Sequence, residues 1–134
     1  GSLDYSFNNF NHVRMGNVPP YSAMFSGINV VTALDAGRLF IGGAFTRVDN
    51  EQRGCMACVD TAGNLLDCWA NGGLHPISYT NSGYPNFGLA GLRTLANGET
   101  YIYGMYKGIT DANGYHPEQV CVSRFYMPDV GVAE

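Results

Sequence analysis

The residues LDAGRLFIGGAF at positions 34–45 recur in altered form as LANGETYIYGMY at positions 95–106. The two segments lie 61 positions apart. A leucine, a glycine, an aromatic residue, an isoleucine, a second glycine and a second aromatic residue recur in the same order. Self-similarity at one fixed spacing is typical of proteins built from repeated structural units. The chain is therefore predicted to contain two copies of one unit.

The similarity continues downstream of this segment. Residues 53–59 correspond to residues 119–125 at a spacing of 66 positions. The second copy therefore carries about five extra residues, which we place within Asp111–Pro117.

The end of the first copy resembles the beginning of the chain. Residues 1–8 are similar to residues 63–71, so Gly1-Ser2 is read as native repeat sequence. We expect a single unit over residues 1–134, with 8–69 as the first repeat and 70–134 plus 1–7 as the second.

Each copy is predicted to fold as short antiparallel strands, because apolar and aromatic runs alternate with turn residues. Gly37 and Gly98 stand where a hairpin turn favours positive φ. Gly43 and Gly104, inside strands, indicate a bulge or a close backbone approach. No segment of ten or more residues has helical periodicity. The expected strands are Ile28–Leu34, Arg38–Phe45, Arg53–Val59 and Leu65–Trp69, then Leu89–Leu95, Glu99–Tyr106 and Gln119–Tyr126.

Four short antiparallel strands per repeat form the unit of a β-propeller blade. The second copy has no fourth strand after Tyr126, so we expect Gly1–Phe7 to pair with Gln119–Tyr126 of the same or a neighbouring chain. The predicted fold class is all-β, with two four-stranded antiparallel blades, an exchanged terminal strand and completion by oligomerisation. Trp69 and Phe7 are expected to pack in the seam between blades.

These motifs resemble the delta-60 repeat, a β-propeller repeat of bacterial and bacteriophage proteins. The match covers DAGRLFIGGAFTRVDN at 35–50, residues 53–60 and residues 63–69. The second copy departs from the pattern, with Tyr103 for the first paired glycine and Lys107 for threonine. The resemblance implies the propeller fold and no common reaction, so function depends on sites built onto the blades.

Charge and hydropathy argue against two classes of partner. Seven Lys and Arg residues oppose 11 Asp and Glu residues, which gives a net charge of −4. No basic run is present to hold a phosphate backbone, and no apolar run reaches the length of a membrane span. We therefore expect neither nucleic-acid binding nor a membrane span.

Two long segments between strands are the candidates for a binding site. Residues 9–24 and 70–86 are longer than simple connectors, and such loops are usually functional or pack on a neighbour. Two interpretations stay open: a carbohydrate pocket lined by Tyr, Asn and His, or packing against neighbouring blades or subunits. His12 and His75 occupy equivalent repeat positions. The candidate ligand-binding residues are His12, Tyr21, His75, Tyr79 and Tyr84.

The sequence lacks the motifs of catalysis. It has no nucleophile elbow, no HExxH motif and no Walker loop, so we expect no enzyme, no catalytic residue, no cofactor and no metal. Cys55, Cys58, Cys68 and Cys121 are interpreted as small buried residues. A Cys58–Cys68 disulfide and a metal site are the less favoured alternatives. Asp111–Gly114 is interpreted as a turn, since it lacks the ligand set of a calcium loop.

The sequence favours a non-enzymatic structural or interaction module of a virion, such as a phage tail or fibre, or of a bacterial surface assembly. The alternative is a lectin-like propeller that binds a glycan. Two blades leave two open sides, so we expect a homo-oligomer, with a trimer favoured, or docking onto other virion or surface proteins. The expected location is extracellular or on the virion surface.

Overall fold

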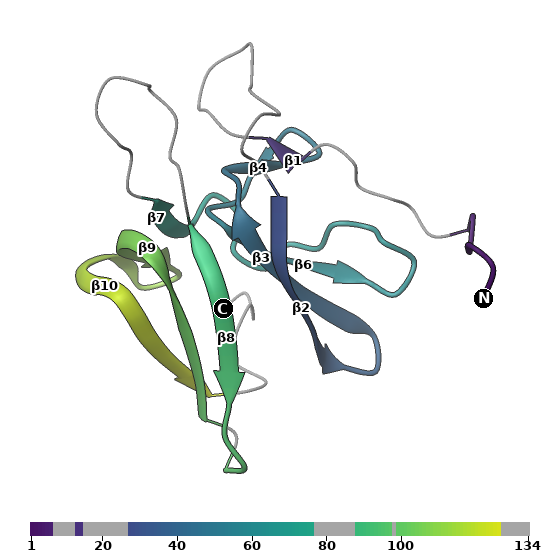
Figure 1. Cartoon of the computed structure of the whole chain (residues 1–134). Helices are drawn as coiled ribbons and strands as arrows, with labels where there is room; N and C mark the ends of the chain where they lie inside the picture. The colour runs from purple at the N-terminus through teal and green to yellow at the C-terminus, as the bar shows by residue number, and fades with distance from the viewer. Residues whose placement is uncertain (7–12, 15–26, 77–87, 98, 127–134) are drawn as a thin grey trace.

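The computed structural model describes residues 1–6, 13–14, 27–76, 88–97 and 99–126 (Figure 1). These residues form β-sheets with antiparallel strand pairing and no helix, so the predicted all-β class is confirmed. No sheet closes on itself within the described residues. The strands are β1 (Val13–Arg14), β2 (Gly27–Asp35), β3 (Arg38–Ala44), β4 (Arg47–Val48), β5 (Glu51–Gln52), β6 (Met56–Asp60), β7 (Gly73–Pro76), β8 (Leu89–Thr94), β9 (Glu99–Asp111) and β10 (Gly114–Tyr126).

The first sheet contains β2, β3 and β6, in that order. Between β3 and β6, the chain makes the short hairpin β4–β5, which was not predicted. The backbone amide of Cys55 donates to the Phe45 carbonyl, and that of Arg53 donates to the Thr46 carbonyl, both at 3.0 Å. The chain therefore forms one long hairpin here. Its first arm consists of β3 and β4, and its second arm consists of β5 and β6.

The second sheet has β9 as its central strand. β10 pairs with β9 along its whole length, and the hairpin closes where Gly114 lies opposite Asp111. Along the other edge of β9, β8 pairs with the first half and β7 with the second half. The extra residues predicted within Asp111–Pro117 therefore lie within this hairpin.

The two sheets repeat the same strand pairing. Val31 lies opposite Ile41 in the first sheet, and Leu92 lies opposite Ile102 in the second, each 61 positions later. All five pairs between β3 and β6 recur between β9 and β10, displaced by 61 positions on the central strand and 66 on its partner. β2–β3–β6 and β8–β9–β10 are therefore two copies of one three-stranded unit.

Both copies place a cysteine in the left-handed backbone region at the same bulge. Cys55 and Cys121 have φ of 65° and 67°. In the first copy the bulge delays the third strand, which begins at Met56, so the predicted strand start at Arg53 is wrong.

The predicted fourth strand Leu65–Trp69 is also wrong. Leu65 makes a single bridge to Val59, and the chain then leaves the sheet, with Trp69 at a φ of 61°. Residues 1–6 form no strand either, so this segment does not pair with β10 of its own chain. Phe7 lies outside the described residues.

The turn between β2 and β3 differs from the prediction. Gly37 does not adopt a positive φ. Asp35 holds the turn, because its Oδ1 accepts a hydrogen bond from the Gly37 amide at 2.9 Å and its Oδ2 pairs with Arg38 at 3.0 Å. These two contacts, the Gly37 amide above all, lower the pKa of Asp35. Gly98, the equivalent glycine, lies outside the described residues.

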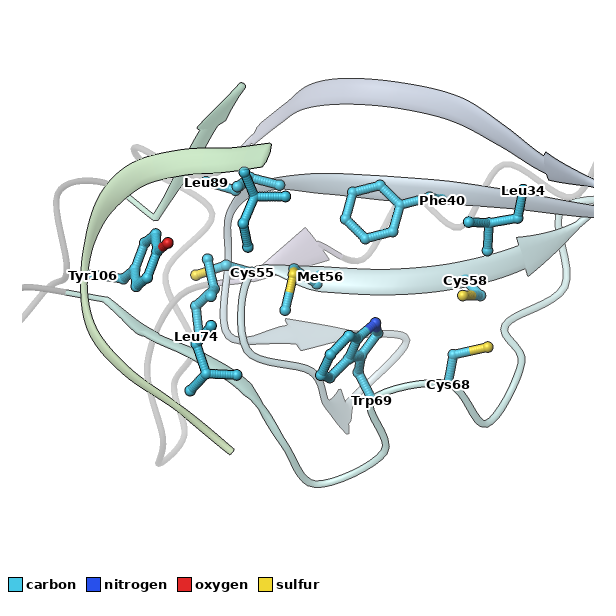
Figure 2. Close-up of a cluster of buried hydrophobic side chains, with 12 residues drawn as sticks. Leu34, Phe40, Cys55, Met56, Cys58, Cys68, Trp69, Leu74, Leu89 and Tyr106 are labelled. Atoms are coloured by element: carbon cyan, nitrogen blue, oxygen red, sulfur yellow. The ribbon is translucent and has the colours of Figure 1, made fainter. Parts of the chain in front are cut away.

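The main core lies in the seam between the two sheets (Figure 2). Phe40 from the first sheet and Leu89 and Ile102 from the second are fully buried there. Trp69 is 9% exposed, and its ring meets Phe125 edge-on with centroids 5.8 Å apart. The prediction that Trp69 packs in this seam is therefore confirmed. A smaller core on the other face of the first sheet contains Ile41, Phe45, Val48, Ala57 and Val59.

Two glycines permit a close backbone approach, once in each copy. A Cβ on Gly43 would overlap the carbonyl oxygen of Gly27, and a Cβ on Gly104 would overlap that of Gly88. The close approach predicted at both positions is confirmed. Because the obstacle is backbone, no side-chain rotation relieves the overlap.

Gly43→Ala should lower the free energy of unfolding by about 1–3 kcal/mol, the scale of an overpacked core. Gly37→Ala is the matched control, since the nearest atom to its Cβ would be Asp35 Oδ1 at 3.9 Å and its φ is not positive. We expect a change below about 0.5 kcal/mol for this control. Urea unfolding measures both, and an equal loss in the two variants would contradict the close approach.

Candidate functional site

One face of the second sheet stands open where the same face of the first sheet is buried. Residues directly opposite one another on neighbouring strands point to the same face of a sheet. In the first sheet, the face that carries Phe40 and Met56 packs against the second sheet. The equivalent face of the second sheet carries Tyr101, Tyr103 and Val122, and here Tyr103 is 41% and Val122 58% exposed. We call these three residues, with Arg124, the outer face.

A shallow hollow of about 370 Å³ lies on the outer face. Glu99 accepts a hydrogen bond from the Tyr101 hydroxyl at 3.0 Å, which fixes one wall. Tyrosine and arginine are enriched where proteins contact one another, so this composition is typical of an interface. The hollow is lined by Tyr101, Gln119, Val122, Ser123 and Arg124.

Tyr103 gives the outer face a shape that the first sheet does not have. The equivalent residue in the first sheet is Gly42, where a Cβ would overlap the Leu89 side chain. The missing side chain therefore admits Leu89 into the seam. In the second sheet, the ring of Tyr103 covers Gly91, which lies directly opposite on β8. An aromatic ring over a strand glycine shields its backbone.

The outer edge of β10 adjoins this face and pairs with none of the described residues. Val120 on this strand is 42% exposed, and Cys121 is exposed as well. Such an edge presents unpaired backbone N–H and C=O groups, which template pairing with another strand.

The structure places only one of the five predicted ligand-binding residues. His75 is exposed on β7, with Nε2 at 2.7 Å from Thr110 Oγ1. Its ring meets Tyr115 edge-on, with centroids 4.8 Å apart, and Tyr115 is 54% exposed. Tyr115 was not predicted, and carbohydrate binding in this region stays a prediction. Outside the described residues lie His12, Tyr21, Tyr79 and Tyr84.

His116 lies between two carboxylates at the β9–β10 turn. Its Nε2 is 3.0 Å from Asp111 Oδ1, and its Nδ1 is 3.5 Å from Glu118 Oε1. The hydrogen bond to Asp111, above all, raises the pKa of His116. Asp111 also accepts from the Asn113 amide at 2.8 Å, so this segment is a turn, as predicted. A hollow of about 290 Å³ beside it is lined by Ile109, Asp111, His116, Gln119, Arg124 and Phe125.

All four cysteines are free, so the alternative of a Cys58–Cys68 disulfide is wrong in this structure. Burial raises the pKa of Cys55 to about 12 and also raises the pKa of Cys58, which keeps both as thiols. The prediction of buried cysteines is confirmed for these two and for Cys68. It is wrong for Cys121, because its bulge lies on the open β10 edge and not in the seam.

The described residues bring together no group of three His, Cys, Asp or Glu side chains that would hold a metal ion. They also include no helix long and apolar enough to cross a membrane. Comparison with family models, curated proteins and solved structures yields no match to this chain.

Asp111→Asn should lower the pKa of His116 toward its ordinary value of 6.5. Because folding raises this pKa, the contact stabilises the fold below pH 6.5, and the contribution is lost as the pH rises through the raised pKa. Glu118→Gln is the matched control and should lower the pKa less, since Glu118 lies farther from the ring. Titration of the His116 ring protons by NMR measures both, and an unchanged pKa in Asp111→Asn would contradict the assignment.

Proposed function

We propose that the chain is a non-enzymatic structural module that assembles with further copies of itself by extending its stack of sheets. The observation that carries this proposal is the exposure of Tyr103 and Val122, on a face whose counterpart in the first sheet forms the main core. Contiguous exposed apolar surface of this kind marks an interaction site. A second molecule of this chain is the partner that fits, because within one chain the same face of the first three-stranded unit already packs against the second unit.

The complementary surface is the outer side of β2. In the seam, Leu89 and Leu92 of β8 pack against the first sheet. Their equivalents on β2 are Ile28 and Val31, which are 37% and 61% exposed. β2 of one copy therefore presents to the outer face of another the kind of side chains that β8 presents inside the chain. Burying a branched aliphatic side chain contributes about 1.5–3 kcal/mol.

A second pair of positions supports the same docking. Cys55 and Gly88 meet in the seam, where a Cβ on Gly88 would overlap the Cys55 sulfur. The equivalent residues are Cys121, which is exposed, and Gly27, where a Cβ would meet nothing within 4 Å. In the proposed assembly, these two residues face each other across the contact between copies.

The contact between copies is expected to be weaker than the seam. Asn29 Nδ2 donates to the Leu89 carbonyl at 2.9 Å, and Ala90 stands at the position equivalent to Asn29. The contact between copies therefore lacks this hydrogen bond. Tyr103 also fills the space that Gly42 leaves for Leu89, so Ile28 of the next copy packs beside the ring. Both differences favour subunits that are separable.

The two surfaces on each copy differ, so the interface is heterologous, and it ends only when the copies close into a ring. Each chain brings two of the three-stranded units, and propellers have about four to eight blades. We favour three chains and six units. The resemblance to the delta-60 repeat supports a place in a virion, such as a phage tail or fibre, or at a bacterial surface, outside the cell.

Val122→Lys and Val31→Lys each place an ammonium group on one side of the proposed contact, and each variant is expected to stay monomeric. Val122→Lys keeps β2 intact, while Val31→Lys keeps the outer face intact. An equimolar mixture therefore restores one contact and should yield dimers. Ala62→Lys, in the exposed turn after β6, is the matched control and should assemble like the unchanged protein. Sedimentation velocity measures these four samples and the unchanged protein.

A mixture that stays monomeric while the unchanged protein assembles would contradict the heterologous contact. An unchanged protein that is monomeric at every concentration would contradict the proposed function itself.

A further inference from the structure

The first sheet carries a fourth segment for which the second sheet has no counterpart among the described residues. Leu65 bridges to Val59 of β6, and the Leu66 amide donates to the Cys58 carbonyl at 2.9 Å. Arg53 is 4% exposed and fixes this segment, because its Nη2 donates to the Leu66 carbonyl at 2.9 Å. The equivalent edge of the second sheet is the edge of β10 that pairs with none of the described residues.

Residues 1–6 carry the sequence that suits this edge. Residues 1–3 (GSL) match residues 63–65 (GNL) at a spacing of 62 positions. Leu3 and Tyr5 are 77% and 89% exposed, so their side chains pack on little of their own chain. In Figure 1, the N-terminus lies beyond β6, on the opposite side of the molecule from β10. The segment is therefore placed to pair with another molecule of this chain and not with its own β10.

The order of elements along the chain favours the same arrangement. Residues 63–66 run along the edge of the first sheet and lead to β8, which packs on that sheet. Residues 1–6 lead in the same way to β2, which in the proposed assembly packs on the second sheet of a neighbour. The segment is thereby delivered to the β10 edge of that neighbour.

We propose that residues 1–6 of one copy extend along β10 of another copy as the fourth strand of its second sheet. Residues 1–6 are given the register that residues 63–66 have against β6 in the first sheet. Leu3 then lies opposite Phe125 of the neighbouring chain, and Asp4 lies opposite Arg124. This inference rests on the proposed assembly and names the segment that holds neighbouring copies together.

The register places suitable chemistry on each face. The Leu3 side chain becomes buried beside Phe125, whose ring packs against the main core. Asp4 and Arg124 bring opposite charges together across the strands, which stabilises a strand pair. In the isolated chain, Asp4 Oδ1 accepts from the Ser6 amide at 2.9 Å. Extending the segment breaks this turn, and the Arg124 guanidinium replaces the donor that the carboxylate loses.

Disulfide cross-linking tests the register. Asp4→Cys and Arg124→Cys are combined in one chain with Cys121→Ser, which removes the exposed native thiol. Residues directly opposite on neighbouring strands lie about 4.5–5.5 Å apart, within reach of a disulfide. Mild oxidation of the assembled protein should yield covalent dimers and trimers on a non-reducing gel. The matched control pairs Asp4→Cys with Ala112→Cys, in the exposed β9–β10 turn, and should stay uncross-linked.

Cross-linking no greater than in the control, with assembly intact by sedimentation, would overturn the strand exchange and leave the proposed assembly standing. A monomeric unchanged protein would overturn both.

Charge reversal answers the same question if the cysteine variants do not assemble. Asp4→Arg and Arg124→Asp should each raise the dissociation constant of the assembly about fivefold, the scale of one cross-strand charge pair. The double variant should restore it, because each copy then offers the reversed pair to its neighbour. A double variant weaker than either single one would overturn the register.

Discussion

Leu89 of β8 packs against Gly42 of β3 at a point where a side chain on the glycine would overlap it. The main core forms around this contact, because Leu89 is fully buried and β8 lies against both β2 and β3. Burying a leucine contributes about 1.5–3 kcal/mol. The neighbouring contact between Gly88 and Cys55 depends on the same approach, since it brings backbone of the second copy to the bulge of the first. Without this contact, the apolar faces that the two three-stranded units bury in the seam would both be exposed.

When each repeat unit buries one face against the next unit, the last unit of the chain has that face exposed. The second sheet has this position, and its outer face carries Val122 where the first sheet carries the buried Met56. The substitution of Gly42 by Tyr103 covers part of the exposed surface and limits what can dock there. The two ends of the stack are therefore unlike, and this asymmetry is the reason why we propose head-to-tail assembly over symmetric pairing.

The repeat predicted the strands whose pairing is local. β2, β3 and β8 lie close to their predicted bounds, and the close approach at Gly43 and Gly104 follows from glycines inside apolar strands. The hairpin turn at Gly37 was mistaken because the Asp35 carboxylate, and not positive φ, holds it. β7 was missed because its pairing partner is the second half of β9, thirty or more residues later.

The candidate site was less predictable than the fold. The contact between His75 and Tyr115 depends on how β7 and β10 flank β9, which no local pattern encodes. The outer face is recognised only once register assigns each side chain to a face. Its one sign in the sequence is a tyrosine at position 103, where the first copy has a glycine.

Native mass spectrometry of the unchanged protein tests head-to-tail assembly most directly, since it counts the copies that share one stack. We expect a closed assembly, of three copies in the arrangement we favour, with no larger open series as concentration rises. A monomer that persists at micromolar concentration and unfolds cooperatively would show that the outer face and the β10 edge are stable without a partner, and would contradict head-to-tail assembly.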